Sequence, residues 1–140
     1  MNILSPGYHR VDLYLFNLSD RLADIARDGW RPPMLTRWQQ LRAYHTLSAY
    51  FGSPWSFADS WLVFGPEQGC RIDMIGDESS PTVVARFDTR SESVQFTTCV
   101  CRLAEQLGCQ LFLPAAGAIV TPHLAALNMA LADLRAHAPA

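Results

Sequence analysis

The sequence predicts a single α+β domain over residues 1–140, with a mainly antiparallel sheet of about four to five strands and helices packed on one face. Hydrophobic residues make up 49% of the 140 residues and charged residues 17%, a composition that can bury one core. The middle of the chain alternates with period two between short turns, which is typical of strands. Two later segments repeat apolar residues at helical spacing. The expected element order is β-α-α-β-β-β-α-β-α.

The first third of the chain predicts one strand and two helices. Residues 8–16 alternate partly and are rich in aromatic and branched side chains, as strands are. A short helix is expected over residues 20–28 and a longer one over residues 36–51. Thr36 and Gln39 match a capping box at the start of the longer helix.

The helix expected over residues 36–51 has two distinctive faces. The face expected to pack on the core carries Leu41, Tyr44, Leu47, Ser48 and Phe51. Trp38, Arg42 and His45 fall on the second face, where Trp38 and Arg42 are four residues apart and can stack by a cation–π contact. Two interpretations stay open. Either residues 55–57 fold over this face and bury it, or the face binds a partner, because Trp and Arg are favoured in interface hot spots.

The middle of the chain predicts a meander of three strands, over residues 61–64, 70–75 and 82–88. Period two places one apolar set of side chains on a single face: Cys70, Ile72, Met74, Val83, Ala85 and Phe87. The opposite face carries the charged side chains Arg71, Asp73, Arg86 and Asp88.

Three interpretations of this charged face stay open. Opposite charges on neighbouring strands usually form a solvated ladder of ion pairs. Alternatively, the arginines and carboxylates select a partner as a recognition surface. In the third interpretation, Asp73 and Asp88 act as paired catalytic carboxylates, which flanking arginines would keep ionised.

The last third predicts helix, strand and helix. The first helix carries one apolar stripe, made of Phe96, Cys99, Val100, Leu103 and Leu107, and Gly108 ends it. A short strand is expected over residues 109–113. In the final helix, expected to begin at Pro122 after a Thr121 cap, the inner face carries Leu124, Leu127, Leu131 and Leu134.

Composition excludes several classes of function. All eleven basic residues are arginine, so no lysine can form a Schiff base or hold a phosphate in a phosphate loop. The formal net charge of −2 leaves no basic excess to neutralise phosphates, so no nucleic-acid partner is expected. No signal peptide and no apolar run of about 18 residues is present, which predicts a cytoplasmic protein without membrane contact. The four cysteines are then expected to be buried thiols.

No catalytic, metal or cofactor motif is present in the sequence. It lacks a Gly-x-Ser-x-Gly elbow, and its histidines and cysteines do not have metal-ligand spacing. An enzyme is therefore not expected, and neither a metal nor a cofactor is predicted. His9, His45, His123 and His137 lie on separate segments, and an active site assembled from distant residues stays open.

The second half of the chain resembles a family of small bacterial proteins. The motifs are ARFDTR (residues 85–90), a helix with Phe96 and Leu103-Ala104, LGCQLFLP (residues 107–114) and IVTPHLAALNMAL (residues 119–131). Over residues 82–135 the chain is similar to immunity proteins encoded beside contact-dependent or type VI secretion toxins. The resemblance implies a protein that binds and neutralises a cognate toxin.

The leading expectation is therefore an immunity-type binding protein. Its expected contact residues are Trp38, Arg42, His45, Arg71, Asp73, Arg86 and Asp88. A small enzyme or ligand-binding domain with an Asp/Arg/His pocket on the sheet is the first alternative. A homo-oligomeric adaptor that uses the second face of the helix over residues 36–51 is the second.

Overall fold

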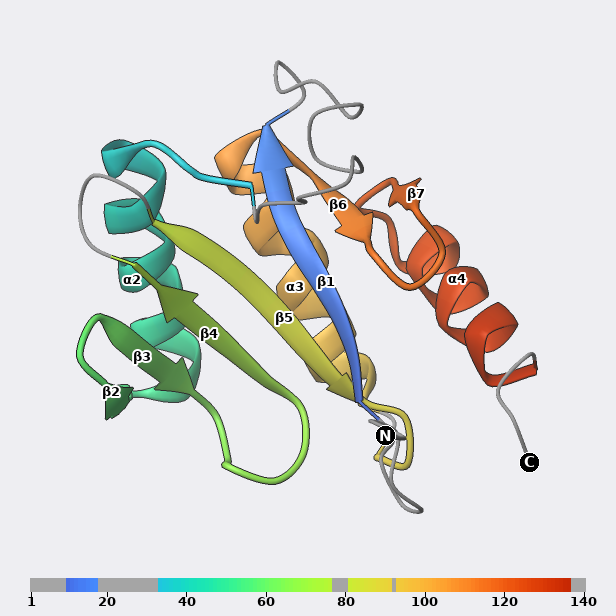
Figure 1. Cartoon of the computed structure of the whole chain (residues 1–140), viewed down its shortest axis with the longest axis horizontal. Coiled ribbons are helices and arrows are strands. Elements are labelled where there is room, and N and C mark those ends of the chain that lie inside the picture. Colours follow the sequence, from blue (N-terminus) through green and yellow to red (C-terminus); the bar gives the residue numbers. More distant parts are fainter. Residues whose placement is uncertain (1–9, 18–32, 77–80, 92, 137–140) are drawn as a thin grey trace, which may run out of the picture.

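The computed structural model describes residues 10–17, 33–76, 81–91 and 93–136. These residues form an α+β fold with a seven-stranded antiparallel sheet and three helices (Figure 1). The α+β class agrees with the prediction. The helix expected over residues 20–28 and the first two residues of the strand expected over residues 8–16 lie outside the described residues.

The first described strand lies inside the sheet rather than at its edge. The strands are β1 (Arg10–Asn17), β2 (Trp55–Ala58), β3 (Trp61–Phe64), β4 (Arg71–Ile75), β5 (Thr82–Asp88), β6 (Cys109–Leu113) and β7 (Ala118–Val120). Their order is β2-β3-β4-β5-β1-β6-β7, and every neighbouring pair is antiparallel. Strand β1 therefore joins a four-stranded meander to the β6–β7 hairpin.

The predicted number of four to five strands is wrong, because β2 and β7 were not anticipated. Both are edge strands, of four and three residues, and each pairs with one neighbour only. Strands this short show almost no alternation of apolar and polar residues. In β2, a bulge between Ser56 and Ala58 also interrupts the register. Residues 55–57, interpreted from the sequence as a segment covering a helix, pair with β3 instead.

Three helices cover one face of the sheet (Figure 1). They are α2 (Arg37–Phe51), α3 (Val94–Leu107) and α4 (Leu124–Ala136). The whole predicted stripe of α3 is buried, and Gly108 ends this helix with a left-handed φ of 68°. Helix α4 buries Leu127 and Leu131 but begins at Leu124, two residues later than expected.

The core lies between these helices and the sheet. The predicted division of the meander by period two is confirmed, since its helix-side residues join one apolar cluster with β1 and β6. That cluster includes Leu13, Leu15, Ile72, Met74, Val83, Ala85, Phe87, Leu111 and Leu113. The remaining side chains of these strands project from the opposite face of the sheet.

The predicted inner face of α2 is correct for Leu47 and Phe51, which pack in the core, and wrong for Leu41. Leu41 is 51% exposed, whereas Gln39, Ala43 and Leu47 are the buried residues of this helix. The side-chain amide of Gln39 accepts a hydrogen bond from the Thr36 N–H, as the predicted capping box requires, and donates one to the Leu107 carbonyl at 2.9 Å. A buried polar anchor of this kind rotates α2 in a way that apolar periodicity does not reveal.

Candidate functional site

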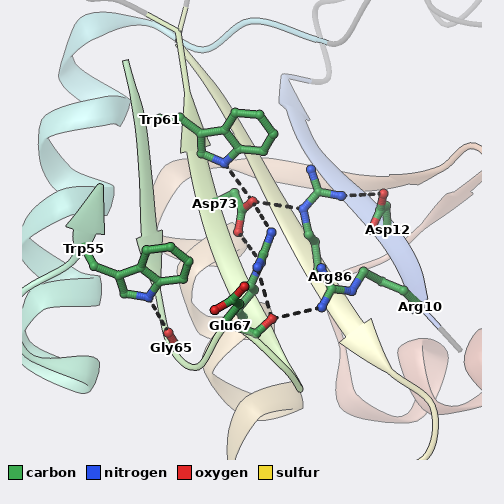
Figure 2. Close-up of polar contacts among 9 residues, drawn as sticks. Arg10, Asp12, Trp55, Trp61, Gly65, Glu67, Asp73 and Arg86 are labelled. Atoms are coloured by element: carbon green, nitrogen blue, oxygen red, sulfur yellow. Dashed lines mark hydrogen bonds and ion pairs between the residues drawn. The ribbon is translucent and has the colours of Figure 1, made fainter. Parts of the chain in front are cut away.

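A network of charged side chains lies on the sheet face opposite the helices (Figure 2). The Asp73 carboxylate, at the centre of β4, is fully buried. Its Oδ2 accepts hydrogen bonds from Trp61 Nε1 at 2.9 Å, from Arg86 Nε at 3.0 Å and from Arg71 Nη2 at 3.2 Å. Its Oδ1 lies 3.0 Å from Arg71 Nε. One carboxylate thus holds two guanidinium groups.

The network extends onto β1 and the loop between β3 and β4. Arg86 Nη1 lies 2.9 Å from Asp12 Oδ2, and Arg71 and Arg10 both donate to the Glu67 carbonyl, at 3.1 and 3.3 Å. Sequence reasoning missed Arg10 and Asp12. The sequence pattern could have placed them on the charged face, because they alternate along β1 with side chains that face the core.

Aromatic side chains border the network (Figure 2). The Trp55 indole donates to the Gly65 carbonyl at 2.8 Å, and the Arg71 guanidinium lies 6.0 Å from the centre of its ring. The ring of Phe57 lies 4.6 Å from that of Trp61. These rings come from the β2–β3 hairpin, and two of them, Trp55 and Trp61, contact the charged side chains at that end of the sheet.

The interpretation of these charges as a solvated ladder is wrong for the centre of the network. Arg71 is 6% exposed and Asp73 0%. Ions out of water hold their places only when paired and hydrogen-bonded, so removing one partner is costly. The same burial leaves Arg71 and Asp73 little surface to offer a partner. Their predicted role as contact residues stays a prediction.

The pKa values of Asp12 and Arg86 are both raised, which favours the neutral form of the carboxyl and the charged form of the guanidinium. Burial raises the pKa of the Asp12 carboxyl, although Arg86 and Arg10 oppose the shift. Its Oδ1 atom is buried and has no hydrogen-bond partner among the residues that the structure describes. For Arg86, burial favours the neutral form, but Asp12 and Asp73 outweigh it and raise the pKa. Arg86 therefore stays charged.

Asp88 is bound by an arginine outside this network. At the end of β5, both of its carboxylate oxygens accept hydrogen bonds from the Arg90 guanidinium, at 3.1 Å each. Asp73 and Asp88 are thus held by different arginines, which weakens their interpretation as a catalytic pair.

A cavity of about 350 Å³ beside Asp88 is also lined by Cys70, Ser91 and Arg135. Burial raises the pKa of the Cys70 thiol, the opposite of what a nucleophilic thiolate needs.

The second predicted group lies on the outer face of α2, which consists of Trp38, Leu41, Arg42 and His45. All four side chains are exposed, Trp38 by 59% and Leu41 by 51%. The interpretation that residues 55–57 bury this face is therefore wrong. Trp38 and Arg42 do not stack, since the one cation–π contact within the described ranges joins Arg71 to Trp55.

The two predicted groups lie on opposite sides of the sheet. Helix α2 packs on the core side, where Tyr44 contacts Phe64 with ring centres 5.8 Å apart, whereas the charged network projects from the other side. One flat interface cannot include both. Two large apolar side chains, Trp38 and Leu41, are exposed on the outer face of α2, whereas Phe57 is the one exposed beside the network in the described part of the chain.

Neither a metal cluster nor a membrane-spanning helix occurs in the described part of the chain. Within residues 10–17, 33–76, 81–91 and 93–136, no group of three or more His, Cys, Asp or Glu side chains could hold a metal ion. None of the described helices is both long enough and apolar enough to span a bilayer. No family model, no curated protein and no solved structure matches this chain.

Proposed function

We propose that this protein is an immunity-type binding protein that neutralises a cognate toxin by covering part of its surface with the outer face of α2. The resemblance over residues 82–135 supports the class of function. The exposure of Trp38 and Leu41 on one helical face carries the assignment of the surface. We place the encounter with the toxin in the cytoplasm.

Energetics favour a binding role for these two side chains. Large apolar groups that stay in water gain nothing from folding, whereas burial stabilises a complex by about 1.5–3 kcal/mol for a side chain of this size. Trp38 and Leu41 are three residues apart on α2 and project together. Arg42 and His45 flank them, which gives an apolar centre with a polar border, as interfaces have.

The test uses the product of the reading frame next to this protein's own gene, because the resemblance implies a neighbouring toxin. That product should arrest growth when expressed alone, and co-expression of this protein should relieve the arrest. By isothermal titration calorimetry, Trp38→Ala should weaken binding by about 2 kcal/mol or more. The circular dichroism spectrum and Tm should not change, because the side chain contributes little to the core.

Met129→Ala is the matched control, because Met129 on α4 is a large apolar residue with 69% exposure. It should bind as the wild type does. Equal binding by Trp38→Ala and the wild type would remove α2 from the interface. If light scattering instead shows wild-type dimers that Trp38→Ala converts to monomers, the homo-oligomeric adaptor replaces the proposal.

A further inference from the structure

The charges on α2 point to the chemistry of its partner. The helix carries Arg37, Arg42 and His45 but no Asp or Glu, in a chain whose formal net charge is −2. We infer that the outer face of α2 docks on an acidic protein surface, with a partner carboxylate bound by Arg42 beside the apolar contact of Trp38 and Leu41. This inference rests on the proposed function and names the kind of surface that it requires.

Arg42 is the residue that this inference singles out. Its side chain is exposed, and within the described ranges it has neither a carboxylate nor an aromatic ring as a partner. Three arginines on or next to the sheet differ, since Arg71, Arg86 and Arg90 are each held by an aspartate of the same chain. A planar guanidinium left without an internal partner is suited to bind a carboxylate through two parallel hydrogen bonds.

The position of Arg42 adds to its charge. Trp38 lies one turn before it and His45 about one turn after it, so a carboxylate there would sit at the edge of an apolar contact. Exclusion of water by Trp38 and Leu41 strengthens the attraction between the two charges. The apolar residues would supply contact area, and Arg42 would select the partner and its orientation.

A protein partner fits this face better than a membrane or a nucleic acid does. The inner side of α2 is fixed in the core by Ala43 and Leu47, so only a narrow stripe could enter a lipid surface. Juxtamembrane segments that bind anionic lipids carry about 4–8 basic residues, whereas α2 carries two arginines. Two arginines also neutralise too few phosphates for tight nucleic-acid binding.

The test compares charge variants against the same neighbouring gene product. Arg42→Glu should weaken binding by about 100-fold or more, because like charges then face each other, and Arg42→Lys should retain part of the affinity. Raising the salt concentration should slow association of the wild type but not that of Arg42→Glu. Arg102→Glu on α3, a reversal at another exposed arginine, is the matched control and should leave affinity within about twofold.

The outcomes separate this inference from the proposed function. If Trp38→Ala weakens binding while Arg42→Glu and salt have no effect, the binding function stands and the acidic partner is wrong. If neither variant changes the affinity, both are wrong.

Sedimentation with phosphatidylserine vesicles gives one further check: binding by the wild type that Arg42→Glu abolishes would replace the protein partner with a lipid surface. A partner Asp→Arg or Glu→Arg change that restores binding to Arg42→Glu would identify the carboxylate.

Discussion

Asp73 is a carboxylate removed from water and surrounded by donors. Trp61, Arg71 and Arg86 all donate to it, and their elements, β3, β4 and β5, are neighbours in the sheet. The network therefore fastens three strands together on the face that the helices do not cover. The loss of one partner should lower the free energy of unfolding strongly, because an unpaired guanidinium is far less stable in the protein interior than in water.

Replacement of Asp73 tests this role directly. Asp73→Asn removes the negative charge between two guanidinium groups with little change in volume, and should lower the free energy of unfolding by about 3 kcal/mol or more. Urea denaturation followed by circular dichroism measures the loss. Asp59→Asn, in the exposed turn between β2 and β3, should change stability by no more than about 0.5 kcal/mol. Equal stabilities for the two variants would show that the network contributes nothing.

At the scale of elements, α2 is positioned by one amide rather than by its apolar residues alone. Gln39 exchanges hydrogen bonds with the Asn17 side chain in both directions, and it also bonds the Leu107 carbonyl at the end of α3. These bonds connect α2 to β1 and α3 at one point. They also determine which side chains α2 turns outward, Trp38 and Arg42 among them.

The value of this anchor can be measured with Gln39→Leu. The substitution replaces the amide with an apolar side chain of similar size and leaves the part-buried Asn17 amide and the buried Leu107 carbonyl without their partner, so stability should fall by about 2 kcal/mol. Gln95→Leu, at an exposed position of α3, should be close to neutral in the same thermal denaturation. A Gln39→Leu variant as stable as the wild type would mean that packing alone positions α2.

The sequence was most informative where one physical effect decides the outcome. The stripe of α3 follows from the burial of apolar side chains, and the two faces of the meander follow from the alternation of side chains along a strand, and both were predicted correctly. The inner face of α2 was predicted only in part, because a buried glutamine such as Gln39 is indistinguishable from an exposed one in a hydrophobic pattern. Edge strands β2 and β7 were missed because they are short and each pairs with a neighbouring strand on one side only. Arg71, Asp73 and Arg86 were predicted to share a face, but Trp55 and Trp61 also contact them, and the pairing of β2, β3 and β4 that places these two indoles was not predicted in full.

At the scale of the whole molecule, β1 makes the sheet one unit. It pairs with β5 on one side and β6 on the other, so both halves of the sheet depend on it. Leu13, fully buried in its centre, contributes to the core shared by all three described helices. The sheet is therefore expected to unfold in one cooperative transition.

Leu13→Ala tests that cooperativity. A cavity at this position should lower the free energy of unfolding by about 2–5 kcal/mol. In urea, the NMR indole signals of Trp55 and Trp61, at the far end of the sheet, should disappear at the same midpoint as the helical circular dichroism. Indole signals that persist beyond that midpoint would show that the β2–β5 meander folds independently of β1.

The central place of β1 also has a consequence for the chain during its synthesis. Its residues leave the ribosome well before β5, and before β6, whose last residue is Leu113. At translation rates of about 5–20 residues per second, roughly 5–20 seconds pass before both neighbours exist. During that interval the mainly apolar segment from Val11 to Phe16 has unpaired strand edges, which can pair with other nascent chains. A chaperone that binds this segment during synthesis should therefore raise the yield of folded protein, even if the folded protein is stable once it has formed.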